Sequence, residues 1–188
     1  MIFRGGGRKQ SAEITAVTLS IAALLAVFVP MIAEAILSAR HEGALRALGA
    51  VEPPDDVYRI MQIAYPGAFA ALIAEGALRG VRGGVACDAG AALFLASKAL
   101  KYWAIASLGT RWTFRVLVPP GSAPVRRGPY RWIAHPNYLA VAGELAAVAL
   151  AMHAIVTGAP AVVGFSLLMR RRAQIEERAL AEGTIRRA

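Results

Sequence analysis

Two short stretches of the sequence collect the side chains that could do chemistry. Residues 128–138, GPYRWIAHPNY, hold His135 together with two tyrosines. Residues 170–180, RRRAQIEERAL, hold Arg172 and Glu176, which share one face of a helix because they lie four positions apart. An imidazole, a carboxylate, a guanidinium and aromatic rings together suit a ligand that carries both a cation and a carboxylate. The aromatic faces and the carboxylate attract the cation, and the guanidinium binds the ligand's carboxylate.

Several other kinds of site have no basis in this sequence. The three histidines, at positions 41, 135 and 153, lack the spacing of metal ligands, so no metal site is expected. A single cysteine, Cys87, excludes an internal disulfide and a cysteine-built metal site. The formal net charge of +9 comes from arginines that cluster between apolar blocks, a pattern typical of membrane flanks rather than of nucleic-acid binding.

The composition indicates a polytopic membrane protein. Hydrophobic residues make up 57% of the chain, mean hydropathy is +0.50, and the apolar residues gather in long blocks. A soluble domain of this length would have close to half its residues apolar and would spread them periodically. We therefore expect an all-α integral membrane fold in a single domain, residues 1–188, that is surrounded by the lipid bilayer.

Five transmembrane helices are predicted, with residues 38–56 as a polar loop after the first. The first three spans fall within residues 14–108, and the C-terminal region, 109–188, would carry the site. The last two apolar pieces are short for full spans, so we expect them to form a helical hairpin. The second piece should continue as a helix through the charged stretch to near Gly183. The predicted spans are residues 14–37, 57–78, 85–108, 138–152 and 161–169.

The distribution of basic residues predicts how the chain lies in the membrane. With five crossings, one side receives 13 arginines outside the spans and the other side receives 5 basic residues. The positive-inside rule then places the C-terminus and both chemical stretches in the cytoplasm, and the N-terminus outside. We expect a multi-pass protein of a bacterial inner membrane, and the sequence leaves its oligomeric state open.

Charged residues inside the predicted spans should be paired or reach the membrane surface, because an isolated charge there costs roughly 2.5–3.5 kcal/mol. Glu144 is expected to face a cavity or a lysine such as Lys101. We expect Glu75 and Lys98 to pair or to extend toward span ends, although such charges are also found along transport paths.

The two stretches resemble the isoprenylcysteine carboxyl methyltransferase family, within a wider group of membrane methyltransferases that includes phospholipid methyltransferases. The family pattern is G-x-Y-x-x-x-R-H-P-x-Y, a short helical hairpin, and then R-x-x-x-E-E-x-x-L. The match covers about residues 117–180 of this chain. Ala134 stands where the family usually has arginine, and Ala140 stands where glycine often follows the first motif.

The resemblance implies S-adenosyl-L-methionine as the methyl donor and S-adenosyl-L-homocysteine as its product. It further implies a donor site at the cytoplasmic face, beneath a tunnel that opens to the bilayer. Arg172, Glu176 and His135 are implied as catalytic residues, with Arg172 near the reacting group. The implied cofactor-binding residues are Ser122, Ala123, Pro124, Val125, Tyr130, His135, Pro136, Asn137, Tyr138 and Glu176.

We therefore expect methyl transfer to a lipophilic acceptor at the cytoplasmic membrane face. The acceptor stays open among a prenylated cysteine carboxylate, a phospholipid amine, and the hydroxyl of an alkylresorcinol or alkylpyrone. A carboxylate needs only Arg172 to orient it, whereas a hydroxyl needs a base, for which His135 and Glu176 are candidates. Two other interpretations are an NADPH-dependent enzyme similar to sterol reductases and a non-enzymatic small transporter.

Overall fold

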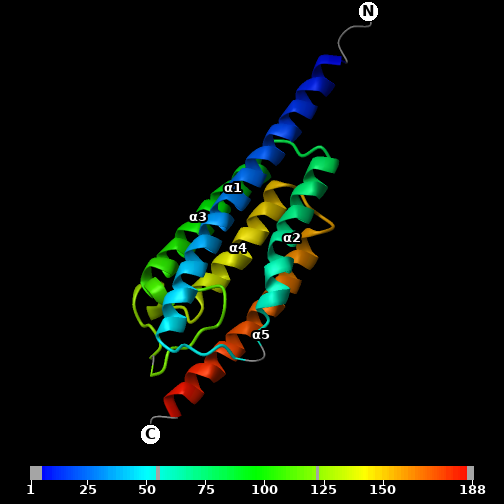
Figure 1. Cartoon of the computed structure of the whole chain (residues 1–188). Helices are drawn as coiled ribbons and strands as arrows, with labels where there is room; N and C mark the ends of the chain where they lie inside the picture. Colours follow the sequence, from blue (N-terminus) through cyan, green and yellow to red (C-terminus); the bar gives the residue numbers. More distant parts are fainter. Residues whose placement is uncertain (1–5, 54–55, 122, 186–188) are drawn as a thin grey trace, which may run out of the picture.

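The computed structural model describes residues 6–53, 56–121 and 123–185, and helices dominate it (Figure 1). Among these residues there is no strand, and one isolated antiparallel bridge joins Val51 to Val118. The predicted all-α fold is therefore confirmed. In chain order the helices are α1 (Gly6–Ala47), α2 (Tyr58–Leu78), α3 (Val85–Leu108), the short 3-10 helices η1 (Gly109–Arg111) and η2 (Gly128–Arg131), α4 (Pro136–Ala151) and α5 (Gly158–Ile185).

Helix α1 is longer than the sequence predicts. It contains the predicted span 14–37 but continues through residues 38–47, which we expected to be loop. Most of those residues are good helix formers, and Leu45 among them is only 2% exposed, so packing favours the helix. The chain turns away at Gly49, whose φ of +78° suits glycine. Helix α1, roughly 63 Å long, extends at its N-terminal end beyond the other helices (Figure 1).

Within the described part of the chain, three helices are long and apolar enough to cross a membrane: α1, α2 and α3. Helix α4 is apolar but has only 16 residues, and α5 is apolar only in its first half. These last two helices form the predicted hairpin, and α5 runs on through the charged stretch without a break. A membrane location is thus supported, whereas five crossings and their orientation stay predictions.

A carboxylate of α2 holds the turn between α4 and α5. Glu75 accepts hydrogen bonds from the backbone N–H groups of Val156 and Thr157, at 3.0 and 2.8 Å, and from the Thr157 hydroxyl at 2.7 Å. It also pairs with Arg79 at 2.8 Å. The expectation that Glu75 is paired is therefore confirmed, and these contacts attach the hairpin to α2.

Helices α3 and α4 approach closely because a small residue lies between them. A side chain at Gly90 would come within 2.6 Å of the Ala151 nitrogen and 2.7 Å of the Ala147 oxygen, so only glycine fits there. Between membrane helices, small residues allow the close backbone contact on which dispersion attraction depends. The largest fully buried apolar side chains of the bundle are Phe69, Leu72, Leu145 and Met152.

Four buried charges and a tyrosine form one group inside the bundle, which we call the buried ion cluster. Lys101 lies 2.8 Å from Glu34 and 3.3 Å from Glu144, and Lys98 lies 2.9 Å from Glu34. The Tyr65 hydroxyl donates to Glu144 at 2.6 Å and accepts from Lys101 at 3.1 Å. The predicted pairing of Glu144 with Lys101 is confirmed. The cluster connects α1, α2, α3 and α4, and its charges balance, as charges in an apolar interior should.

Candidate active site

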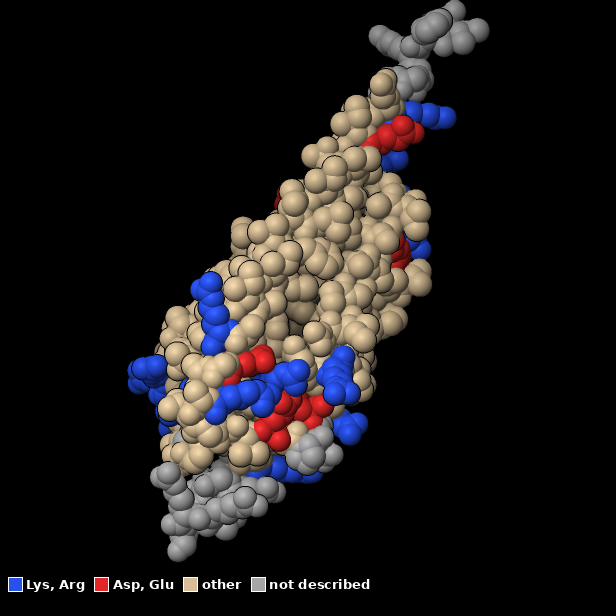
Figure 2. All heavy atoms as spheres, in the orientation of Figure 1, with Lys and Arg blue, Asp and Glu red and all other residues tan. Residues whose placement is uncertain are grey.

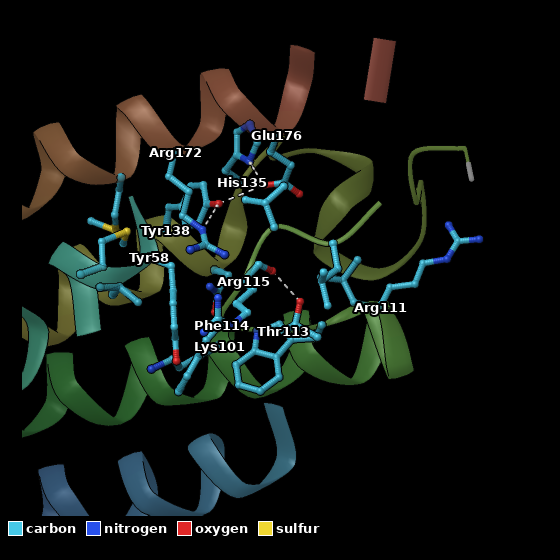
Figure 3. Close-up of a pocket in the computed structure, with 18 of the residues that line it drawn as sticks. Tyr58, Lys101, Arg111, Thr113, Phe114, Arg115, His135, Tyr138, Arg172 and Glu176 are labelled. Atoms are coloured by element: carbon cyan, nitrogen blue, oxygen red, sulfur yellow. Dashed lines mark hydrogen bonds and ion pairs between the residues drawn. The ribbon is translucent and has the colours of Figure 1, made fainter. Parts of the chain in front are cut away.

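The two chemical stretches meet where α4 begins and the charged half of α5 passes it. The Tyr138 hydroxyl donates to Glu176 at 2.9 Å and accepts from Arg172 Nε at 3.1 Å. His135 lies between two carboxylates, with Nε2 2.9 Å from Glu177 and Nδ1 4.0 Å from Glu176. Figure 3 shows these side chains converging from the two helices. The structure thus brings together the two stretches that the sequence singled out.

Backbone conformation explains how α4 presents its first residues to α5. Gly128, with a φ of +58°, allows the turn into η2. Pro136 occupies the first position of α4, where a missing N–H costs nothing. His135 precedes the helix without capping it through its side chain, so the imidazole is free to contact α5. The ring stacks on Tyr138, with centroids 5.1 Å apart and planes 10° apart.

The site opens into a cavity of about 340 Å³ that extends from the polar residues into the helix bundle. On α2 and α5 the lining residues recur every three or four positions, so they form continuous stripes along each helix. Lys101 and Tyr65 of the buried ion cluster also line the cavity. The cavity therefore has a charged end and an apolar end, the latter lined by Met31, Met61, Val141, Phe165 and Met169.

Most residues singled out from the sequence line this cavity. Arg172 does so, whereas Pro136, which is fully buried at the start of α4, is not among the lining residues. A ligand contact by Pro136 therefore has no geometric support. Ser122 lies outside the described residues. The implied cofactor-binding residues that line the cavity are Ala123, Pro124, Val125, Tyr130, His135, Asn137, Tyr138 and Glu176.

A family profile matches the region that builds this site. The profile of the "Isoprenylcysteine carboxyl methyltransferase (ICMT) family" covers residues 90–182, from within α3 to within α5. The chain belongs to the isoprenylcysteine carboxyl methyltransferase (ICMT) family. The predicted family is thus confirmed. Because this is a family of methyltransferases, and three helices suit a membrane, the protein is a membrane methyltransferase.

Two bacterial relatives are similar to this ICMT-family chain over most of its length. "Uncharacterized protein YpbQ" of Bacillus subtilis (strain 168) is 32% identical over 154 residues, which covers 82% of this chain and 92% of that relative. An "Uncharacterized protein" of Haemophilus influenzae is 26% identical over 146 residues, or 77% of this chain and 85% of that relative. Both similarities extend beyond the region that the family profile covers. No solved structure matches the chain.

The site contains a carboxylate that the ICMT motifs do not include. Asp56 Oδ1 lies 3.6 Å from Arg172 Nη1, and both side chains are almost completely buried. Asp56 also accepts the backbone N–H groups of Val116, at 2.9 Å, and of Tyr58, at 3.2 Å. It therefore holds Arg172, the start of α2 and the segment after α3 in one place. The sequence predicted only a loop at residue 56, since nothing local relates it to residue 172.

Two arginines of the segment after α3 also line the cavity of the ICMT-family site. Arg111 donates to the Ala123 carbonyl at 2.8 Å and so positions the segment implied to bind the cofactor. Arg115 lies 2.7 Å from Glu52, and its guanidinium sits 4.3 Å from the centre of the Tyr58 ring. From the sequence alone, both arginines contributed only to the predicted orientation in the membrane.

Glu177 is a further residue of the site that the sequence did not predict. Helical spacing places it about 100° around α5 from Glu176, away from the shared face of the motif. The structure nevertheless gives it the 2.9 Å contact with His135, because His135 approaches α5 between the two glutamates. The signal that could have found it is the paired E-E of the second ICMT motif.

Burial and nearby charges decide which groups at the site can exchange protons. Burial, and then the negative charge of Glu176, raises the pKa of Tyr130 well above its usual value. Its phenol therefore stays protonated and can donate a hydrogen bond but cannot act as a base. Burial alone would raise the pKa of Glu52, yet hydrogen bonds from Arg46 and Arg115 lower the pKa overall. Glu52 thus stays ionised beside Arg115.

Proposed function

We propose that this protein transfers a methyl group from S-adenosyl-L-methionine to a carboxylate or hydroxyl oxygen of a lipophilic acceptor, at the cytoplasmic face of the membrane. The observation that carries the proposal is a single cavity with two chemically different ends. The charged end contains His135, Arg172 and Glu176, and the apolar end lies among the helices. A charged methyl donor suits the first end and a lipid chain suits the second.

The charged end has groups that suit a ligand with a sulfonium and an amino group. The Glu176 carboxylate and the rings of Tyr130 and Tyr138 attract a cation. Asn137 Oδ1 is buried without a hydrogen-bond partner among the described residues, so it is available to an N–H of a ligand. Residues 123–125 line the same cavity. These residues would hold S-adenosyl-L-methionine, which supplies an activated methyl group when bound.

The cavity also reaches the outer surface of the bundle. Ala35 of α1 and Gln62 of α2 line the cavity and are exposed, which indicates an opening between these two helices. Both helices are long and apolar enough to cross a membrane. This geometry supports entry of the acceptor from the bilayer, with its chain lying against Met61, Phe165 and Met169.

The chemistry requires placement more than it requires reactive side chains. Arg172, held by Tyr138 and Asp56, would orient the acceptor oxygen, and the apolar wall would exclude water. Positioning of this kind can contribute roughly 7–11 kcal/mol. A carboxylate acceptor needs no base. A hydroxyl acceptor gives up its proton, which His135 or Glu176 would accept.

Calorimetry with the detergent-purified protein tests the proposal. We expect saturable binding of S-adenosyl-L-methionine and S-adenosyl-L-homocysteine, and no binding of NADPH, the cofactor of the sterol-reductase-like alternative. Glu176→Gln should weaken binding about tenfold or more, because a hydrogen bond to a charged group contributes roughly 1.5–3 kcal/mol. Glu13→Gln, at an exposed position near the other end of the bundle, should leave binding unchanged. A protein that folds normally but binds neither ligand would overturn the proposal.

Methyl transfer itself is measured with isotopically labelled S-adenosyl-L-methionine and a bacterial lipid extract. We expect label in the lipid fraction, and mass spectrometry of the labelled product names the acceptor group. Arg172→Met should abolish the incorporation while S-adenosyl-L-homocysteine still binds, since Arg172 is proposed to act on the acceptor. Equal incorporation by this variant and the unchanged protein would contradict the role proposed for Arg172.

A further inference from the structure

The cavity wall opposite the two motifs is built by the segment that follows α3, residues 109–118. Figure 3 shows Thr113 and Phe114 on the side of the cavity away from Arg172 and Glu176. Neither motif includes this segment. Trp112 lies within it, lines the cavity and is only 3% exposed.

Trp112 is held in one position by contacts on every side. Its backbone N–H donates to the Gly109 carbonyl at 3.0 Å, and its own carbonyl accepts from His41 Nδ1 at 2.8 Å. The indole packs edge-on against Phe114, with ring centroids 5.3 Å apart and planes at 67°. These contacts fix the residue in the wall of the cavity.

The indole N–H of Trp112 is a buried donor that lacks an acceptor. Nε1 has no hydrogen-bond partner in the part of the chain that the structure describes. An indole nitrogen can only donate, and a buried donor without an acceptor is unfavourable. Because Trp112 lines the cavity, an oxygen atom of a bound ligand would supply the missing acceptor.

Trp112 is anchored through its backbone to α1, the helix that also borders the opening by which the acceptor would enter. It contacts His41 of α1, and Ala35 on the same helix lines the opening between α1 and α2. These two residues lie roughly 9 Å apart along the helix axis. The groups that suit the methyl donor come instead from η2, α4, α5 and residues 123–125.

We propose that Trp112 recognises the methyl acceptor by donating a hydrogen bond to an oxygen of its head group. The inference rests on the proposed methyl transfer and restricts the class of acceptor: its head group presents a carbonyl, hydroxyl or carboxylate oxygen. An ammonium head group has no lone pair for this N–H, and its charge would lie near those of Arg172 and Arg115. The site therefore favours a head group that ends in an oxygen function over one that ends in an ammonium.

The fluorescence of Trp112 alone tests this recognition. The chain has three tryptophans, and the other two, Trp103 and Trp132, are exposed and are not among the residues that line the cavity. The Trp103→Phe/Trp132→Phe double variant keeps Trp112 as its tryptophan. In detergent that contains a constant concentration of S-adenosyl-L-homocysteine, this variant is titrated separately with methyl laurate, dodecane and dodecylamine. We expect the emission of Trp112 to change in a saturable way. The half-saturating concentration of methyl laurate should be roughly five- to tenfold lower than that of dodecane or dodecylamine, because one hydrogen bond contributes about that factor in affinity. Equal responses, or a preference for dodecylamine, would overturn the proposal.

A second variant tests the same inference through turnover. Trp112→Phe keeps the aromatic contact but removes the N–H, so the lipid extract concentration that half-saturates methyl incorporation should rise roughly five- to tenfold. Affinity for S-adenosyl-L-homocysteine should stay unchanged, whereas the Tm should fall somewhat because the smaller ring leaves a void at a buried position. Trp103→Phe should change neither the half-saturating concentration nor that affinity. If Trp112→Phe lowers only the Tm, Trp112 is a packing residue and the inference fails. Failure of the proposed function is distinct, because the unmodified protein would then not bind S-adenosyl-L-homocysteine.

Discussion

Tyr138 is the side chain on which the charged end of the cavity depends most. Its hydroxyl donates to Glu176 and accepts from Arg172, so it sets the relative position of a carboxylate and a guanidinium on neighbouring turns of α5. Without that hydroxyl, the contact left to Arg172 among the described residues would be the longer one with Asp56, at 3.6 Å. One phenol therefore aligns the group proposed to hold the donor with the group proposed to hold the acceptor.

We predict that Tyr138→Phe weakens binding of S-adenosyl-L-homocysteine about tenfold, because Glu176, the carboxylate proposed to hold the donor, loses the hydroxyl that positions it. The affinity is measured by calorimetry in detergent. Glu13→Gln is the control, because Glu13 is exposed near the other end of the bundle and is absent from the cavity lining. An unchanged affinity in Tyr138→Phe would show that Tyr138 does not organise the donor site.

The lowered pKa of Glu52 predicts a pH dependence of stability. A carboxyl group with a lowered folded pKa contributes stability that is complete above its ordinary value, 4.5 here, and that is lost as pH falls through the folded value. We therefore expect Glu52→Gln to be less stable than the unchanged protein near neutral pH, and the difference to shrink below about pH 4.5. Thermal unfolding in detergent across this range measures it. A difference that grows on acidification would contradict the assignment.

Among the elements, the buried ion cluster sets the register of the helices. Lipid chains are as apolar as the side chains between membrane helices, so apolar burial alone distinguishes poorly between alternative helix positions. Lys98 and Lys101 lie on one face of α3 and reach Glu34 on α1 and Glu144 on α4. Only one rotation and depth of these three helices satisfies all the charges. The same cluster fixes the wall of the cavity that Lys101 and Tyr65 line.

Glu144→Gln should lower the free energy of unfolding by about 3–5 kcal/mol, because it leaves buried lysine charge without its partner. The Lys101→Met/Glu144→Met variant should lose less than the two single Met variants lose together, since it removes a charge of each sign. Thermal unfolding in detergent measures each variant, with Glu13→Gln as the exposed control. Full stability of Glu144→Gln would show that the cluster does not hold the helices.

Across the whole molecule, charge is confined mainly to its ends. Figure 2 shows most lysines, arginines, aspartates and glutamates of the visible face toward the end that carries the C-terminus, with fewer toward the N-terminal end and a broad uncharged zone between them. That end also contains the charged part of the cavity. An uncharged belt next to a charged end suits a protein that crosses a bilayer, and the excess of arginine in the sequence of that end is the basis of the predicted cytoplasmic orientation.

Cysteine labelling in intact bacterial cells tests the predicted orientation. Starting from Cys87→Ala, the variants Gly83→Cys and Thr110→Cys place a single exposed thiol at opposite ends of α3. A membrane-impermeant maleimide should label Gly83→Cys from outside and should label Thr110→Cys only after lysis. Labelling of Thr110→Cys in intact cells would invert the orientation, and with it the face at which methyl transfer is proposed.

The sequence by itself determined the family, the helical class and the hairpin that carries the site. Two motifs at characteristic spacing were enough for the family, because the chemistry of a charged ligand requires those residue types together. Apolar blocks of helical length predicted the helices, and the cost of a lone buried charge predicted that Glu144 meets Lys101. The extension of α1 past residue 37 was missed, because its polar residues concealed the buried Leu45.

Only the tertiary structure decided which distant residues complete the site. Asp56 matters because α2 begins beside Arg172, and no local pattern around residue 56 records that contact. Trp112 is one of three tryptophans in the sequence, and burial without an acceptor is what distinguishes it. Burial and pairing depend on which helices pack together. Such packing joins residues far apart in the chain, where spacing along the sequence carries no information about contact.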